Sequence, residues 1–374
     1  MNEFFQNLIR SVKDYFVKKE KSVLGIDISS STIKAVQLRR KRGKAILETY
    51  GEISLGPYAG VESGRATKLS TEKISEALGD LIRESKITAK ECGVAVPLSS
   101  SLLKVIKVPA ASEKQLKDII PIEARKYVPV PMTEVLLDWN VIPNEESYSE
   151  DDGASKPKEI EVMLVAIHKE IINMYQNVLS QNNLESSFFE IELFSTTRSV
   201  LSRGIKPVMI FDFGVSTTKL YIVEEGVIKT SHIVNRGSQD LTLALSKSLG
   251  ISFDEAEDSK RVSGLAGKKE DDENGFSEST SAILEYIYSE VERVITDYQT
   301  KYNKSISKIV LSGGGVLLKN IVDRTSEKFK IEIELANPFK KVEAPAFLEE
   351  ILKKAGPEFA IAVGVALRKL EETI

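Results

Sequence analysis

Two short segments, half a chain apart, carry the same pattern of acidic, hydroxyl and basic side chains. In the first, Asp27 is followed at fixed spacing by a serine, a threonine and a lysine, and the same types follow Asp212 in the second. The offset is constant at 185 residues (212 minus 27). Each copy lies between a predicted strand that ends at the aspartate and a second, alternating strand. The repeat therefore predicts two homologous lobes that each contribute one β-hairpin.

The residue types in this repeat suit a phosphate ligand. A turn of small residues lets backbone N–H groups converge on an anion, and serine and threonine hydroxyls add donors without bulk. An aspartate at a strand end can hold Mg²⁺, which takes one or two carboxylates plus phosphate oxygens and keeps several waters. We therefore expect two facing hairpins to clamp a triphosphate, with Asp27 and Asp212 near the metal ion.

A glycine run from Gly313 to Gly315 follows a third predicted strand and precedes a predicted helix. Glycines allow the backbone to approach a flat, bulky ligand closely, and a helix N-terminus offers partial positive charge. One hairpin or the glycine run alone is weak evidence, because glycine is common in turns. The two hairpins and the glycine run in this order predict nucleotide binding.

These motifs resemble those of the superfamily that contains actin, sugar kinases and heat-shock chaperone ATPases. In this sequence GIDISSSTIK resembles the first phosphate motif of the superfamily and FDFGVSTTK the second. VLSGGGVLLKN resembles its adenosine motif. A narrower resemblance, to the PilM family of type IV pilus assembly proteins and through it to the cell-division protein FtsA, is carried by IPIEARKYVPVPMTEVLLDWNVI, GISFDEAEDSK, LANPF and PEFAIAVGVALR. It extends from about Ser22 to the C-terminus.

The resemblance implies an α/β protein of the actin-like ATPase fold. Two lobes of mixed β-sheet are flanked by helices, and a small α/β subdomain is inserted in the first lobe. Polar, flexible loops are expected at 145–152 and 267–275. The expected division is an N-terminal amphipathic helix at 1–20, first-lobe core at 21–109 and 188–205, inserted subdomain at 110–187, second lobe at 206–357 with a mainly helical part at 237–305, and C-terminal helix at 358–374.

The resemblance also implies that ATP and Mg²⁺ lie in the cleft between the lobes. The metal would lie near Asp27 and Asp212. Glu257 and Lys260 match positions that approach the ribose and base. The full set of candidate nucleotide-binding residues is Asp27, Ser29, Ser30, Ser31, Thr32, Lys34, Asp212, Gly214, Val215, Ser216, Thr217, Thr218, Lys219, Gly237, Glu257, Lys260, Gly313, Gly314, Gly315, Val316 and Asn320.

One of these positions departs from the family pattern. Ser29 stands where the family usually has glycine, and a positive φ at a serine would cost about 1 kcal/mol. We expect this substitution to reduce nucleotide affinity without abolishing it.

The family's partner is the cytoplasmic N-terminal peptide of the inner-membrane protein PilN, which docks between the first lobe and the insertion. The resemblance therefore implies a cytoplasmic protein, peripheral on the inner face of the cytoplasmic membrane.

Residues 1–20 are predicted to form an amphipathic helix that the family pattern does not require. Its apolar side carries Phe4, Phe5, Leu8, Ile9, Val12, Tyr15 and Phe16, and its polar side Arg10, Lys13, Lys18 and Lys19. The helix can pack on its own domain or a partner, or it can lie in the plane of a membrane surface. The pattern alone leaves both interpretations open.

Composition excludes several other classes. A formal net charge of −4 gives no electrostatic footprint for nucleic acid. Cys92 is the single cysteine and is expected to pack in the core, while His168 and His232 lack metal-ligand spacing. No apolar stretch reaches the roughly 18 residues of a membrane span.

Four functions share this fold. An ATP-binding scaffold read by a membrane partner is the leading prediction. A filament-forming FtsA relative would self-associate, and a chaperone-like ATPase would need an appended substrate domain. A sugar kinase would need a carboxylate base, for which Asp118 and Asp138 are the candidates in the insertion. Because no general base is identified, we expect ATP turnover to be slow or negligible.

Overall fold

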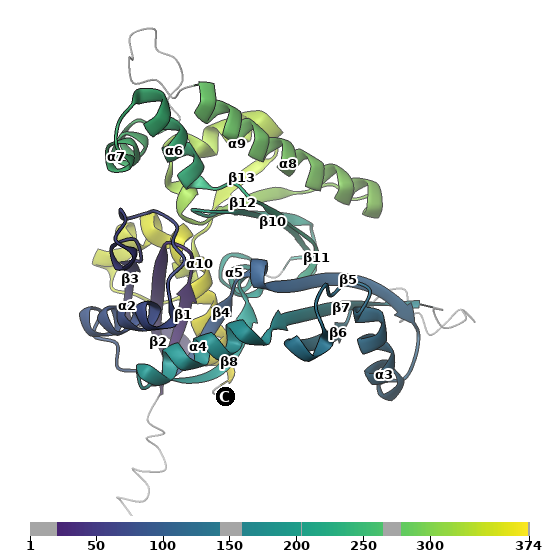
Figure 1. Ribbon diagram of the computed structural model, residues 1–374. Helices are drawn as coiled ribbons and strands as arrows, with labels where there is room; N and C mark the ends of the chain where they lie inside the picture. The colour runs from purple at the N-terminus through teal and green to yellow at the C-terminus, as the bar shows by residue number, and fades with distance from the viewer. Residues whose placement is uncertain (1–20, 143–158, 203, 265–277, 373–374) are drawn as a thin grey trace, which may run out of the picture.

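The structure, a computed structural model, describes residues 21–142, 159–202, 204–264 and 278–372. Two five-stranded sheets form the cores of two lobes, and a three-stranded sheet extends from the first lobe (Figure 1). The predicted helix at 1–20 and the predicted loops at 145–152 and 267–275 lie outside the described residues.

The first sheet has the strand order β3-β2-β1-β4-β8. β1 pairs antiparallel with β2 and parallel with β4, and β8 extends the parallel side. The apolar residues of β1 are buried on both faces because helices cover the sheet. The strands are β1 (Ser22–Ile28), β2 (Thr32–Lys41), β3 (Lys44–Ser54), β4 (Glu91–Val96) and β8 (Glu185–Ile191).

The second sheet repeats this plan with the order β11-β10-β9-β12-β13. β9 occupies the place of β1, with an antiparallel neighbour on one side and a parallel neighbour on the other. The repeat in the sequence is thus part of a duplicated sheet, and the predicted two-lobed α/β fold is confirmed. The strands are β9 (Val208–Phe213), β10 (Thr218–Glu224), β11 (Val227–Val234), β12 (Lys308–Ser312) and β13 (Glu332–Leu335).

The third sheet has β7 between β5 and β6, all antiparallel, and packs against helix α3 (Glu113–Ala124). Its strands are β5 (Ser101–Pro109), β6 (Val135–Val141) and β7 (Glu159–His168). Helix α4 (Lys169–Gln181) instead lies against β8 and helix α2 (Thr71–Glu84) of the first lobe. We therefore propose 101–168 as the inserted unit in place of 110–187.

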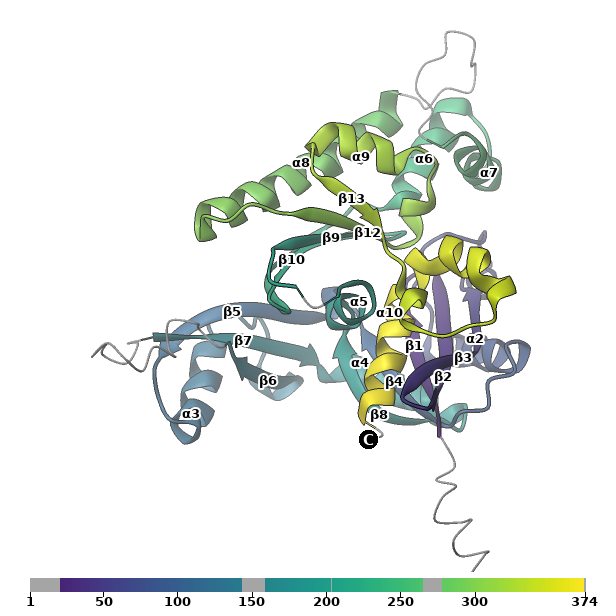
Figure 2. The same cartoon turned by 180° about the vertical axis from the view of Figure 1, so that it is seen from behind.

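In the second lobe, α8 and α9 lie above the sheet on the side away from the first lobe, whereas α6 and α7 lie beside the sheet and border the cleft (Figure 2). The predicted apolar side of α8 is confirmed, since its residues are at most 8% exposed: Leu284, Ile287, Val291, Val294, Ile295 and Tyr298. The helices are α6 (Ser238–Leu249), α7 (Phe253–Ser263), α8 (Glu278–Tyr302) and α9 (Ile321–Phe329).

Helix α10 (Glu349–Glu372) packs along β1 and β2 of the first lobe and crosses helix α5 (Glu192–Val200). It begins before the predicted position 358 and contains Pro357, whose carbonyl accepts a hydrogen bond from the Gly313 N–H at 2.9 Å. A Cβ on Gly364 would lie 1.9 Å from the carbonyl oxygen of Ser195, so the helices can cross this closely only with glycine there. α10 therefore contacts both lobes.

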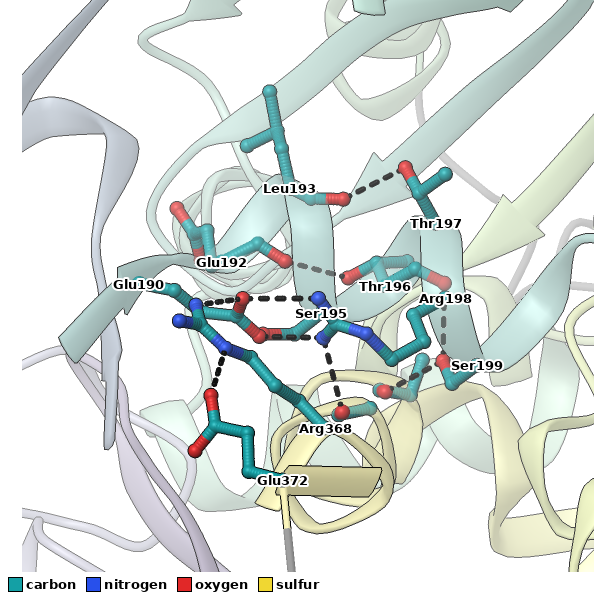
Figure 3. A network of polar contacts seen from close by, with 12 residues as sticks. Glu190, Glu192, Leu193, Ser195, Thr196, Thr197, Arg198, Ser199, Arg368 and Glu372 are labelled. Carbon is teal, nitrogen blue, oxygen red and sulfur yellow. Dashed lines mark hydrogen bonds and ion pairs between the residues drawn. The ribbon is translucent and has the colours of Figure 1, made fainter. Parts of the chain in front are cut away.

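A buried polar network fixes this crossing. Figure 3 shows the Glu190 carboxylate between the guanidinium groups of Arg198 and Arg368. The Ser195 hydroxyl donates to the same carboxylate at 2.6 Å. Because Arg368 belongs to α10 and the other three residues to β8 and α5, the network joins the C-terminal helix to the first lobe.

Candidate functional site

A cavity of about 360 Å³ lies between the lobes, where the carboxyl ends of β1 and β9 meet. The structure brings most of the predicted site residues together around it. Those lining the cavity are Asp27, Ser29, Ser30, Ser31, Thr32, Lys34, Asp212, Gly214, Val215, Ser216, Thr217, Lys219, Glu257, Lys260, Gly313, Gly314 and Gly315.

The two repeated turns face each other across this cavity. Each turn is closed by the same bond, from the Ser29 N–H to the Thr32 carbonyl (2.9 Å) in the first lobe and from Gly214 to Thr217 (3.1 Å) in the second. The hydroxyls of Ser30 and Ser216 lie 3.0 Å apart, although they are 186 residues apart in the chain. The turns therefore converge on one small volume.

The backbone strain considered at Ser29 is absent, while the expected reduction in nucleotide affinity stays a prediction. Ser29 is not among the described residues with positive φ. Its hydroxyl donates to the Thr32 carbonyl at 3.0 Å and accepts from the Thr32 N–H at 3.3 Å. Serine thus closes the turn with its own side chain, so glycine is not required for backbone reasons.

Two buried aspartates lie at the base of the cavity. Asp27 and Asp212 are 6% and 5% exposed, and each is paired across its hairpin with a lysine, Lys34 or Lys219. Burial raises the pKa of Asp27 from 3.8 to about 7; Lys34 opposes the rise and Glu192 adds to it. An incoming cation would restore the charged form, because it stabilises the carboxylate.

The cavity contains an acidic residue that sequence reasoning missed. Glu192 begins α5 directly after β8, and its carboxylate accepts from the Leu98 N–H at 2.8 Å and from Lys219 Nζ at 3.0 Å. Burial would lower the pKa of Lys219, but Asp212 and Glu192 outweigh it and hold that pKa above its usual value. The available signal was a glutamate within the apolar segment FFEIELF at a strand end.

The glycine run lies beside Asp212, because Ser312 pairs with Asp212 in the sheet, but its predicted helix start is wrong. Gly314–Leu317 form a 3₁₀ turn, and α9 begins only at Ile321. Gly313 has a φ of +86°, and a Cβ there would lie 2.4 Å from Asp212 Oδ1. A Cβ on Gly314 would lie 2.8 Å from Glu358 Oε1. The run therefore leaves room close to the backbone without offering an α-helix N-terminus.

Helix α7 supplies a polar wall from the second lobe. Lys260 Nζ lies 2.7 Å from Glu257 Oε2 and 2.8 Å from Thr242 Oγ1. Burial lowers the pKa of Lys260. Burial alone would raise the pKa of Glu257, but the nearby Lys260 holds that pKa below its usual value. Arg261 of α7 and Glu358 of α10 also line the cavity and were not predicted.

Four predicted residues do not line the cavity. Thr218 is buried and donates to the Arg236 carbonyl at 2.8 Å. A Cβ on Gly237 would lie 2.2 Å from the Val215 carbonyl oxygen, so this glycine lets α6 pack behind the second turn. Val316 is in the apolar core, and Asn320 is exposed at the start of α9.

Other candidates lie away from the cavity. Asp118 and Asp138, the carboxylates considered for a sugar kinase, are exposed on α3 and β6. His168 precedes α4, and His232 lies 2.8 Å from Glu290 on the second lobe. Cys92 is fully buried, which confirms its packing role, and burial raises the pKa of its thiol to about 12.

The residues around the cavity fit a triphosphate with a divalent cation. Three lysines and several serine and threonine hydroxyls offer donors, and two aspartates offer oxygens. No cluster of three or more metal-ligating side chains occurs in the part of the chain that the structure describes. Mg²⁺ does not need one, because phosphate oxygens and water complete its shell.

Duplicated sheets around an interlobe cleft define the actin-like fold class. Solved structures with this fold include a PilM–PilN type IV pilus biogenesis complex, 20% identical with a TM-score of 0.78 over 93% of this chain and 98% of that chain. MreB5 of Spiroplasma citri bound to AMPPNP is 13% identical, with a TM-score of 0.50 over 95% and 99%. These likenesses show the shared fold.

The family follows from the sequence comparison. The model of the type IV pilus assembly protein PilM family matches residues 25–370, and the chain belongs to this family. The cell-division protein FtsA of Neisseria meningitidis serogroup B is 24% identical over 314 residues, 75% of this chain and 76% of FtsA. Of the helices described, none is long and apolar enough to cross a membrane.

Proposed function

We propose that the interlobe cleft binds Mg-ATP and that nucleotide sets the angle between the lobes. The observation that carries this proposal is the approach of the two repeated turns, with the Ser30 and Ser216 hydroxyls 3.0 Å apart. A ligand that contacts both turns binds one interlobe arrangement better than others and so shifts the population toward it. The solved MreB5 structure with AMPPNP supports nucleotide as that ligand.

Calorimetric titration of the purified protein with Mg-ATP tests this proposal. We expect the Asp27→Ala variant to bind 10- to 100-fold more weakly, because it lacks a carboxylate that would hold the metal or its waters. Asp118→Ala, which changes an exposed aspartate, should bind like the wild type. Absence of binding by nucleotide-free wild type would overturn the proposal.

The second part of the proposal concerns the partner. We propose that this protein is a cytoplasmic scaffold that binds the cytoplasmic N-terminal peptide of a PilN-like inner-membrane protein. Family membership and the fold shared with the solved PilM–PilN complex support this assignment. Titration with the synthetic peptide is expected to give different affinities with and without Mg-ATP. Equal affinities would mean that peptide binding does not depend on bound nucleotide.

Residues 65–67 of the first lobe reach across to the second lobe beside the cleft. The Ala66 N–H donates to Gln239 Oε1 at 3.0 Å, and the Arg65 guanidinium carbon lies 5.5 Å from the Phe253 ring centroid. The Thr67 N–H donates to the Ser30 carbonyl at 2.8 Å. The segment thus ties the first phosphate turn to helices α6 and α7.

Removing this tie is expected to speed nucleotide release. Gln239→Ala deletes one hydrogen bond between the lobes, worth about 1 kcal/mol, which corresponds to roughly fivefold faster dissociation. Stopped-flow release of a fluorescent ATP analogue measures the rate. Gln299→Ala, an exposed position on α8, is the matched control, and equal rates in all three proteins would exclude a role for the contact.

A further inference from the structure

The turn between β2 and β3 carries a dense group of cations. Residues 39–44 form the basic hairpin, with the sequence RRKRGK. Lys41 pairs with Lys44 in the strand register, and Arg42 and Gly43 form the tip with φ values of 51° and 80°. Arginine is a poor choice for the left-handed position of such a turn, where asparagine or glycine is preferred.

Two further lysines join the basic hairpin. The 3₁₀ turn η6 (Pro338–Lys341) lies beside β3, because the Glu343 N–H donates to the Ala45 carbonyl at 2.8 Å. Lys340 and Lys341 line one surface hollow together with Arg40 and Lys44. Glu343 and Glu371 line the same hollow, so cations outnumber carboxylates there by two to one.

Some cations of the basic hairpin and of η6 are paired with neighbouring groups, and others are not. Arg39 pairs with Glu48, Lys44 pairs with Glu343, and the Lys341 ammonium donates to two backbone carbonyls. In contrast, Lys41, Arg42 and Lys340 are exposed, and their side chains make no hydrogen bond or ion pair with another described residue. Three unneutralised cations therefore face solvent from one end of the lobe.

The described part of the chain begins and ends at this end of the lobe. Ser22 pairs with Arg39 in the sheet, so β1 starts beside the basic hairpin. Lys21 and Lys369 both pair with Glu91, which places the start of β1 near the end of α10. In both views the start of β1 and the end of α10 lie at the pole of the first lobe that points away from the second lobe (Figures 1 and 2).

We propose that this pole, formed by the basic hairpin with Lys340 and Lys341, docks on anionic phospholipid headgroups. The amphipathic pattern that the sequence predicts for residues 1–20 would supply a second membrane signal, with Arg10, Lys13, Lys18 and Lys19 on its polar side. A single weak anchor gives only marginal binding, whereas an amphipathic segment plus a basic patch gives stable attachment. The proposal rests on the proposed location at the cytoplasmic membrane and names the surface that faces it.

The geometry leaves the cleft free in this orientation. β2 runs for ten residues from Thr32 at the cavity to Lys41 at the tip. At about 3.3 Å per residue, the basic hairpin lies roughly 30 Å from the phosphate turn. Nucleotide can therefore exchange while the opposite pole contacts lipid.

Vesicle co-sedimentation of the full-length chain tests the proposal. The probes are vesicles of phosphatidylglycerol with phosphatidylcholine and vesicles of phosphatidylcholine alone, at low and high salt. The variant is Lys41→Ser/Arg42→Asn/Lys340→Ala, in which asparagine suits the left-handed tip. Each removed cation weakens binding to the anionic surface about fivefold, so the triple variant should bind about 100-fold more weakly.

The matched control removes three exposed lysines from elsewhere, as Lys107→Ser/Lys114→Ser/Lys247→Ser, and should bind like the wild type. Mg-ATP titration of each protein reports separately on the cleft, so failure of the nucleotide proposal is distinguishable from failure of this one. Equal vesicle binding by wild type and variant would assign attachment to residues 1–20 alone and overturn the proposal. The proposal is also overturned if the wild type does not bind anionic vesicles or if the control variant loses as much vesicle binding as the triple variant. A triple variant that loses binding to duplex DNA but keeps binding to vesicles would overturn it as well.

Discussion

Replacing Glu190 with alanine is expected to lower the free energy of unfolding by about 3 kcal/mol. Glu190 is 5% exposed, and its carboxylate accepts from Arg198 at 2.6 Å and 3.0 Å and from Arg368 at 2.8 Å (Figure 3). Alanine would remove the anion between two facing guanidinium groups, of which only Arg368 keeps another carboxylate, Glu372, and would leave the Ser195 hydroxyl without its acceptor. The value lies at the low end for buried pairs because Arg198 and Arg368 are partly exposed.

Urea denaturation followed by circular dichroism measures this loss. The matched control is Glu372→Ala, which removes an exposed carboxylate that lies 3.0 Å from Arg368 Nε. A surface pair of this kind contributes about 0.5 kcal/mol or less. If Glu190→Ala costs no more than the control, the network does not hold α10 against the first lobe.

Asp27→Asn is expected to stabilise the nucleotide-free protein at alkaline pH. Burial raises the pKa of Asp27 to about 7 in the folded state, against 3.8 for an aspartate side chain in water. The unfolded chain therefore ionises at lower pH than the folded chain. Wild-type stability from this group is fully present below pH 3.8, falls between pH 3.8 and 7, and stays reduced above pH 7. Asparagine does not ionise and escapes the loss.

The expected gain of Asp27→Asn over wild type grows by about 3 kcal/mol between pH 5 and pH 8, on the scale of 1.36 kcal/mol per pKa unit. Denaturation midpoints at both pH values, in EDTA and without nucleotide, measure it. Ser216→Ala adds no titrating group and should follow the wild-type profile. Parallel profiles for wild type and Asp27→Asn would mean that the buried carboxyl ionises as readily as in the unfolded chain. The buried carboxyl group that lowers the stability of the nucleotide-free protein at pH 8 is the one proposed to bind Mg²⁺. The metal site therefore reduces the stability of the protein without its ligand.

Much of the fold was predictable because its signals are local. The repeated motif, an aspartate near a strand end, a turn of small residues and a lysine in the next strand, occupies nine residues in each copy, 26–34 and 211–219. Hairpin register then places Asp27 opposite Lys34 and Asp212 opposite Lys219 without any long-range information. The apolar side of α8 was likewise visible as a helical period, which burial follows directly.

The parts that were missed depend on contacts between distant segments. Glu192 enters the cavity because α5 starts at the end of β8, and Glu358 enters because α10 passes the glycine run. Asn320 was placed wrongly because a 3₁₀ turn, rather than an α-helix, follows Gly313 and rotates the later residues away. Apart from the glutamate in FFEIELF, no motif in the sequence distinguishes these outcomes.

The sequence by itself therefore determined the duplicated hairpins, the two lobes and the aspartates and lysines at the base of the cleft, because each is fixed by residues close together in the chain. Only the tertiary structure decided which charges meet there and what joins the lobes. Ser30 and Ser216 are 186 residues apart, and Glu190 and Arg368 are 178 apart. Such pairs form only when whole sheets and helices have packed, since packing and not local preference sets the distance between them.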